Sequence, residues 1–339
     1  MLSVNVERDV VRVGERFSVD FQRTLRIPDD GNTYPLPPGL GRFPVFRVDD
    51  YRERVPEAWK EHGGVFIPMY QREALWLNFH GAHWKPNAVK VAVGKVNAVS
   101  GEVWSQELRG GEQDYVVVPD QPWLDGINAG DGHIRQFVAM PLGMGYTVEG
   151  QVTGKEEFGG VQIVVFDPKP GKFPDEPPKA DERLREMAVY AMAAPAESAE
   201  MGLAAGGRMR QKIYPDEHGV DTWDMENFGR VCLHIVNSMM FREITGLEPP
   251  PTPVTAKMYT ERGFPWFDLY DEGKKDIPAS ETLSKVKSVK GMDKEKGFDP
   301  QQDDEPVEVP DEQVKKLGES PGAVRDGEWW PGSRRRRRH

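Results

Sequence analysis

Alternation of hydrophobic and polar side chains dominates the first half of the chain and predicts β-strands there. In residues 1–28, apolar side chains occupy every second position of three short runs, with a turn predicted at residues 13–16. Further strands are predicted from runs that are rich in β-branched and aromatic residues and bounded by Gly, Pro or Asn: 65–67, 74–79, 88–93, 115–118, 134–138, 148–152 and 161–166. These runs predict a β-rich domain at residues 1–166.

The segments between the strands indicate the fold class. Turn-forming residues separate the strands, and long stretches of helical periodicity are missing between them. We therefore predict a mainly β fold, sandwich or barrel-like, rather than a fold in which strands and helices alternate. A short helix interrupted by Pro56 is expected within residues 49–62.

The second half of the chain predicts a smaller α+β part. Residues 167–180 are rich in proline and predict an extended linker. Residues 181–271 are expected to form an α-containing domain, or an extension packed on the first domain. Its helices are predicted at 181–194 and 224–244, because apolar residues recur there at three- and four-residue steps, and a strand-like run follows the first helix at 209–214.

The last segment, residues 272–339, mixes Lys, Asp, Glu and Pro with few aromatic residues. Such a composition buries too little apolar surface to offset chain entropy, so we expect a disordered tail. It ends in Trp329 and Trp330 followed by the run Arg334–Arg338. Two interpretations of that run remain open, a contact with anionic surfaces and a solvated appendage.

Charge and composition narrow the function classes. The formal net charge of −11 argues against nucleic-acid binding, which requires a basic face. Cys232 is the single cysteine, so no intrachain disulfide forms and a reducing compartment is expected. No apolar run approaches the roughly 20 residues that span a bilayer, and no signal peptide is recognised at the N-terminus. We expect a soluble, cytoplasmic protein.

Several segments carry a family resemblance. They are GGVFIPMYQREALWLNF, NAVKVAVGKVNAVSGEVW, DYVVVPDQPWLDG, IRQFVAMPLGMGYTVEGQVTG, MGLAAGGRMRQKIY and PPTPVTAKMYTERGFPWFDLY, and together they cover most of residues 63–270. They resemble an uncharacterised family of bacterial and filamentous fungal proteins, often labelled automatically "integral membrane protein". The resemblance implies no established activity, cofactor or catalytic residue. It implies that residues 1–270 form one functional unit.

Charged and amide side chains within the apolar runs supply one candidate site. Arg135, Glu149 and Gln151 occupy predicted strands, and Glu73 precedes another. They form either a polar sheet face or a pocket in which Arg135 binds an anionic or amide-bearing ligand and Glu149 orients it. If Phe137 points into the core, Arg135 shares its face and requires an acidic partner, Glu73 or Glu149.

Aromatic and histidine side chains supply the remaining candidates. Tyr70 and Trp123 belong to a group of large aromatic residues that either stack on a ligand or fill the core. His80 and His83 have a spacing that allows a metal site only if a third ligand comes near, and solvated loop histidines are the alternative.

No nucleophile, cofactor or phosphate-binding motif is recognised, so no cofactor is predicted. We therefore predict a binding or self-assembly module that associates with itself, as a homo-oligomer, or with another protein. The alternative is an enzyme that acts on a small polar substrate through the carboxylate and arginine pocket.

Overall fold

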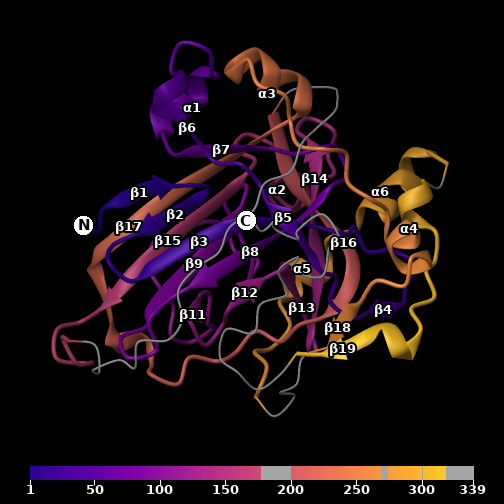
Figure 1. The fold of residues 1–339 in the computed structure, drawn as a ribbon. Coiled ribbons are helices and arrows are strands. Elements are labelled where there is room, and N and C mark those ends of the chain that lie inside the picture. The colour runs from indigo at the N-terminus through magenta and orange to yellow at the C-terminus, as the bar shows by residue number, and fades with distance from the viewer. Residues whose placement is uncertain (177–199, 269–273, 300, 318–339) are drawn as a thin grey trace, which may run out of the picture.

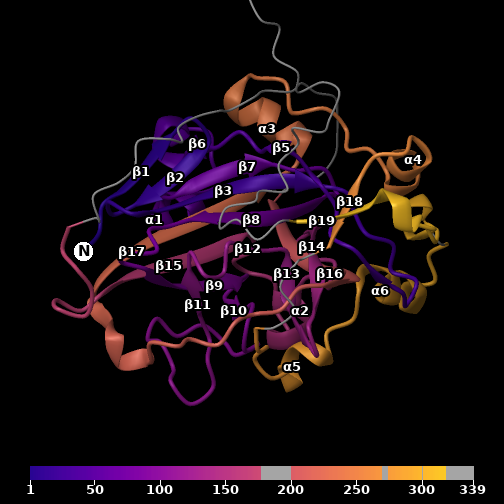
Figure 2. The ribbon, with the colours of Figure 1, turned by 60° about the horizontal axis from the view of Figure 1, so that its bottom comes forward.

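The computed structural model describes residues 1–176, 200–268, 274–299 and 301–317, and the helix predicted at 181–194 lies outside them. The chain is mainly β, with 36% strand against 18% helix, which confirms the predicted fold class. The strands form two layers that enclose a shared core (Figures 1 and 2). No helix in the described part of the chain is long and apolar enough to cross a membrane.

The first layer contains the N-terminal strands. β1 (Val4–Glu7), β2 (Val10–Val13), β3 (Phe17–Thr24) and β8 (Ala74–His80) are antiparallel neighbours in that order. β5 (Gly39–Arg42) pairs with the end of β3, and β12 (Trp123–Leu124) pairs with β8.

The second layer is built around the longest strand, β17 (Trp223–Val236). Its antiparallel neighbours are, in order, β15 (Val161–Pro168), β9 (Asn87–Val93) and β11 (Val116–Val118). β10 (Val96–Asn97) forms a hairpin with β9, while β7 (Val65–Pro68) runs parallel to β17 and pairs with β6 (Phe46–Arg47).

Two long strands join the layers into one sheet. β14 (His133–Pro141) pairs with β8, with β13 (Gly126–Gly130) and with β16 (Glu200–Arg210). β16 in turn pairs with β17 and with β4 (Thr33–Tyr34). Residues 200–236 therefore belong to the same sheet as the N-terminal strands.

Alternation along the strands builds the core between the layers. Val19 and Leu77 from the first layer and Val91, Ile163 and Leu233 from the second are all buried in one cluster. A second apolar cluster joins Phe66 of β7 and Val236 of β17 to buried side chains of α1 (Glu57–His62) and α3 (Ser238–Thr245). Within residues 49–62, where a helix interrupted by Pro56 was expected, the structure has the 3-10 turn η1 (Val48–Tyr51) before Pro56 and α1 directly after it.

The helix predicted at 224–244 is wrong, because most of that segment is the strand β17. The error has a physical cause: residues 233–236 are buried on both faces, so their apolar run carries no clear period of two. The helix α3 begins only at Ser238, after Asn237 caps it by accepting from the Met239 and Met240 amides.

The strand predicted at 148–152 is also wrong, because α2 (Val148–Thr153) is a helix. Thr147 caps it by accepting a 3.0 Å hydrogen bond from the Gly150 amide, and left-handed Gly154 ends it. These two signals were present in the sequence.

The C-terminal segment packs against the sheet where disorder was expected. α4 (Ala256–Glu261) and β18 (Trp266–Asp268) precede α5 (Glu281–Ser284), α6 (Val289–Lys296), the 3-10 turns η3 (Gln302–Asp304) and η4 (Asp311–Gln313), and β19 (Val314–Lys316). Leu283, Val286 and Val289 are buried. The prediction of disorder from residue 272 is therefore corrected for 274–299 and 301–317, where most of the few apolar residues are buried or partly buried and Phe298 is exposed. Residues 318–339, with the Arg334–Arg338 run, lie outside the described residues.

Candidate functional site: an arginine–carboxylate cavity

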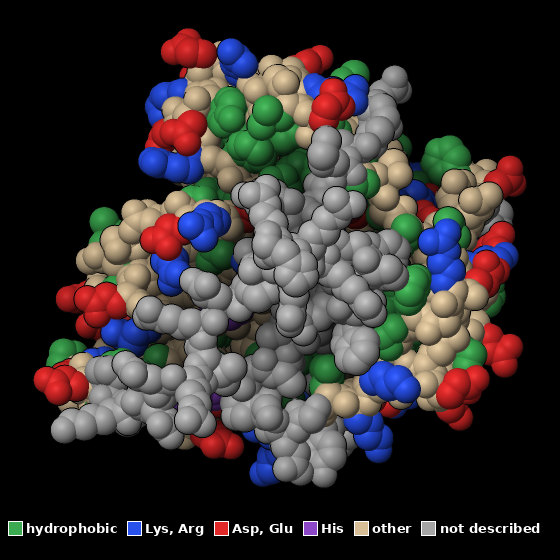
Figure 3. Space-filling view, in the orientation of Figure 1, with side chains coloured by type: hydrophobic (Ala, Val, Ile, Leu, Met, Phe, Trp, Pro, Cys, Tyr) green, Lys and Arg blue, Asp and Glu red, His purple; other side chains and the backbone are tan. Residues whose placement is uncertain are grey.

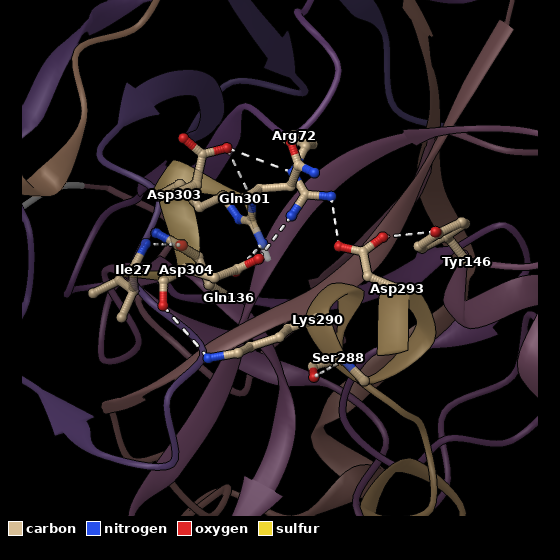
Figure 4. A network of polar contacts seen from close by, with 12 residues as sticks. Ile27, Arg72, Gln136, Tyr146, Ser288, Lys290, Asp293, Gln301, Asp303 and Asp304 are labelled. Carbon is tan, nitrogen blue, oxygen red and sulfur yellow. Dashed lines mark hydrogen bonds and ion pairs between the residues drawn. The ribbon is translucent and has the colours of Figure 1, made fainter. Parts of the chain in front are cut away.

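A cavity of about 190 Å³ lies where β3 ends and β8 begins. Its walls come from Thr24 and Arg26, from the turn at residues 70–74, from residues 252–256 and from Asp303. Two arginines, Arg26 and Arg72, and two carboxylates, Glu73 and Asp303, line it. Figure 4 shows the network of polar contacts to which Arg72 and Asp303 belong.

Arg72 is the centre of this network. Its φ of 69° is a left-handed conformation that non-glycine residues rarely adopt, and its backbone amide donates a 2.7 Å hydrogen bond to the Ala139 carbonyl of β14. The guanidinium donates to Asp293 at 2.8 Å and to Asp304 at 2.9 Å. The strained turn thus directs a nearly buried cation toward the C-terminal segment.

Arg26 approaches the same carboxylates from the end of β3. It donates to Asp304 Oδ1 at 2.7 Å and to Asp303 Oδ2 at 3.1 Å. Burial, and then the nearby Arg72, lower the pKa of Arg26. The buried amide of Gln136 fixes the backbone on either side of Arg26, because it accepts from the Ile27 amide and donates to the Leu25 carbonyl.

The two aspartates of η3 are held differently. Asp304 is fully buried and accepts from Arg26 and Arg72 through different oxygens. Burial raises the pKa of Asp304, although both arginines oppose this shift. The Asp303 side chain is 32% exposed, and its Oδ2 lies 3.1 Å from Arg26 Nη1 and 3.5 Å from Arg72 Nε. Asp303 is therefore the more weakly held of the pair.

Glu73 follows Arg72 in the turn. Its side chain contacts Arg23, whereas that of Arg72 contacts Asp293 and Asp304. Arg23 Nε donates to Glu73 Oε1 at 2.7 Å, and the Tyr70 amide donates to Oε2 at 2.9 Å. Burial raises the pKa of Glu73, against the lowering by Arg23. The Tyr70 hydroxyl donates to the Pro250 carbonyl at 2.8 Å, which anchors the loop that forms the far wall.

Helix α6 closes the network through Asp293. Asp293 accepts from the Tyr146 hydroxyl at 2.7 Å as well as from Arg72. Burial and this hydrogen bond raise the pKa of Tyr146. Ser288 caps the N-terminus of α6 and so sets the position of Asp293.

The structure places Tyr70 and Glu73 at the cavity and the other predicted residues elsewhere. Arg135 donates to the Val286 carbonyl, not to Glu73 or Glu149, which corrects the expected ion pair. Phe137 and Ala139 do face the core, but the pairing with β16 is irregular between Arg135 and Phe137. A register shift at that point removes the basis for assigning Arg135 to the face of Phe137.

Glu149 has a structural role that strand periodicity did not predict. Its carboxylate accepts three hydrogen bonds of 2.9 Å, from the backbone amides of Glu157, Phe158 and Gly159. It therefore organises the loop after α2. Gln151 exchanges hydrogen bonds with the backbone of Lys287 and so fastens the C-terminal segment to α2.

Trp123 and the two histidines lie outside the cavity wall. Trp123 packs edge-on against Trp76 with ring centroids 6.1 Å apart. His80 Nε2 is 2.9 Å from the buried carboxylate of Asp20, and His83 is exposed. Across the described ranges, no group of three His, Cys, Asp or Glu residues is arranged to hold a metal ion.

Sequence reasoning missed Arg26, Asp293, Asp303 and Asp304. The two adjacent aspartates lie in the segment that was expected to be disordered, so no pairing was predicted for them. The turn sequence YQRE, with two opposite charges beside an apolar strand, was the available signal for Arg72.

Comparisons with family models, with curated proteins and with solved structures found no match to this chain. The resemblance inferred from the sequence stays a prediction, and any functional proposal rests on the geometry of the site.

Proposed function

We propose that this protein binds a small anionic ligand in the cavity between β3, the 70–74 turn and η3. The observation that carries the proposal concerns the Nε atoms of Arg26 and Arg72. Both are buried and, among the described residues, have no hydrogen-bond partner; Arg72 Nε faces only Asp303 Oδ2, at 3.5 Å, and both arginines line the cavity. A buried donor without an acceptor costs roughly 1–3 kcal/mol, and a bound acceptor removes that cost.

The chemistry of the walls supports an anion of modest size. A guanidinium presents Nε and Nη donors as a planar fork that fits a carboxylate or phosphate through two parallel hydrogen bonds. A volume of 190 Å³ corresponds to about six water-sized groups. This matches an organic acid of a few carbon atoms or a phosphate, and is small for a whole peptide or nucleotide.

Binding is tested by thermal shift and calorimetry with acetate, succinate, phosphate and the neutral analogue acetamide. We expect at least one anion to raise the melting temperature, because a ligand that binds only the folded state stabilises it, and we expect acetamide to have no effect. Arg26→Lys keeps the charge but removes the planar fork, and should abolish the shift.

Arg210→Lys is the matched control, since Arg210 lines a different groove and is half exposed. Each anion is added at about 100 mM, which is about 100 times a Kd of about 1 mM. If none of them raises the melting temperature at this concentration, the proposal is rejected. A shift that survives in Arg26→Lys would place the anion elsewhere.

A catalytic role is the second candidate, and one observation favours it. Glu73 lies in the cavity wall, and burial raises its pKa above the usual value of a glutamate, the direction that favours a general acid. We propose that, if a bound acid is converted, Glu73 is the proton-transfer residue. The test is product analysis by mass spectrometry after incubation with wild type and Glu73→Gln. Conversion by both proteins at equal rates would exclude Glu73.

Self-association, predicted from the sequence, stays a prediction. Hydrophobic side chains gather on the surface around α1 and α3 (Figure 3), and Met239 and Leu247 near α3 are 41% and 49% exposed. Light scattering coupled to size exclusion measures the mass directly. A monomer mass at high concentration would contradict the homo-oligomer.

A further inference from the structure

Asp303 occupies the position at the two arginines that a ligand carboxylate would take. Its Oδ2 bridges Arg26 Nη1 and Arg72 Nε, and the side chain lines the cavity. Its Oδ1 accepts no hydrogen bond from the described residues. A carboxylate that uses one oxygen at 3.1 and 3.5 Å satisfies the two guanidinium forks poorly.

Asp304, the neighbour of Asp303 in η3, fixes the same segment independently. Its carboxylate bonds to both arginines at 2.7 and 2.9 Å, and its backbone amide donates to the Gln301 carbonyl at 3.0 Å. The Lys290 ammonium donates to its backbone carbonyl. The turn therefore stays anchored when the Asp303 side chain rotates away from the arginines.

The balance of charges around the cavity favours a ligand anion that replaces the Asp303 carboxylate over one that is added beside it. Arg23, Arg26, Arg72 and Lys290 balance four carboxylates, those of Glu73, Asp293, Asp303 and Asp304. Addition of an anion to this set leaves a buried excess of negative charge, which is costly in a medium of low dielectric constant. If Asp303 turns into solvent as the anion enters, the balance is kept.

Building on the proposed function, we infer that Asp303 is an internal competitor, and that the ligand is a carboxylate which displaces the Asp303 side chain from Arg26 and Arg72. The ligand carboxylate forms the two-pronged contact with Nε and Nη that Asp303 does not make. The apparent affinity of the wild-type protein is therefore its intrinsic affinity multiplied by the fraction of molecules in which Asp303 has left the position.

The test compares acetate and succinate binding by calorimetry to wild type and to Asp303→Asn. The amide of asparagine carries no charge and competes less for the arginines, so we expect the variant to bind at least about tenfold more tightly. Asp303→Ala, which lacks the competing group altogether, should bind at least as tightly as Asp303→Asn.

Asp311→Asn is the control, because it removes the same charge from the same C-terminal segment in the next turn, η4, away from the cavity. Its affinity should equal that of wild type, which separates displacement from a general loss of negative charge. Phosphate in place of the carboxylates distinguishes a carboxylate site from a general anion site. A preference of phosphate over succinate in Asp303→Asn would overturn the carboxylate assignment.

The two proposals fail in different ways. If wild type and Asp303→Asn bind with equal affinity, the cavity binds the anion but Asp303 is not its competitor. If Asp303→Asn binds more weakly, Asp303 is part of the binding site and the inference is wrong. If wild type, Asp303→Asn and Asp303→Ala all fail to bind, the proposed function falls and the inference with it.

Discussion

Arg72 and Asp304 lie 232 residues apart in the sequence and are joined by a 2.9 Å hydrogen bond between buried, oppositely charged groups. This pair connects the strained turn before β8 to the 3-10 turn η3. Together with Arg26 and Asp293, it holds the C-terminal segment against the sheet at the wall of the cavity.

Removal of Arg72 tests how strongly this pair holds the segment. Arg72→Ala leaves Asp293 and Asp304 buried without their cation, and should lower the free energy of unfolding by about 3–5 kcal/mol. Arg72→Gly should cost about 1 kcal/mol less, because glycine adopts the positive φ without strain. Urea denaturation measures both. Arg52→Ala, which breaks an exposed pair with Asp49, should change stability by less than about 1 kcal/mol.

Leu283 tests whether the C-terminal segment belongs to the core. It is 1% exposed on α5, so Leu283→Ala should cost about 2–5 kcal/mol. Leu247→Ala is the matched control, because Leu247 is 49% exposed and its truncation should cost no more than about 0.5 kcal/mol. Equal denaturation midpoints for the two variants would mean that the segment does not pack on the sheet in solution.

Glu149→Gln tests the structural role assigned to Glu149. The variant replaces one carboxylate oxygen by an amide NH₂ that faces a backbone N–H donor, which should cost about 1–3 kcal/mol. Glu157→Gln, in the same loop but with an exposed side chain, should be within about 0.5 kcal/mol of wild type. Thermal denaturation of both variants makes the comparison, and a neutral Glu149→Gln would argue that the amide contacts contribute little.

Because His234 is buried, we expect the protein to lose stability as the pH falls. Burial lowers its pKa from 6.5 to about 4, so the unfolded chain binds a proton between these values that the folded protein does not. The free energy of unfolding is therefore unaffected by this group above pH 6.5. It decreases by about 3 kcal/mol as the pH falls from 6.5 toward 4. His234→Gln does not titrate, so its stability should fall less than that of wild type over this window in urea titrations. Parallel pH profiles would contradict the prediction.

The candidate site was only partly predictable from sequence. Glu73 and Tyr70 were identified because a charged group and a large aromatic residue stand beside an apolar strand, and the structure brings both to the cavity. Arg135 and Glu149 were assigned to the same pocket on the assumption of strict strand alternation. A register shift after Arg135 and a helix at Glu149 break that alternation. Local periodicity does not report such interruptions.

The sequence by itself determined the β-layers, because the period of two is a local property of each strand. The alternation of Val89, Val91 and Val93, or of Val161, Ile163 and Val165, already places these residues on one face, and the structure buries them in the central core. The tertiary structure decided where the charges meet. Arg26 and Asp304 are 278 residues apart, and their contact depends on how the sheet positions a C-terminal segment whose own sequence has little apolar character. A buried ion pair requires that both partners lose water together, and only the complete fold brings them together.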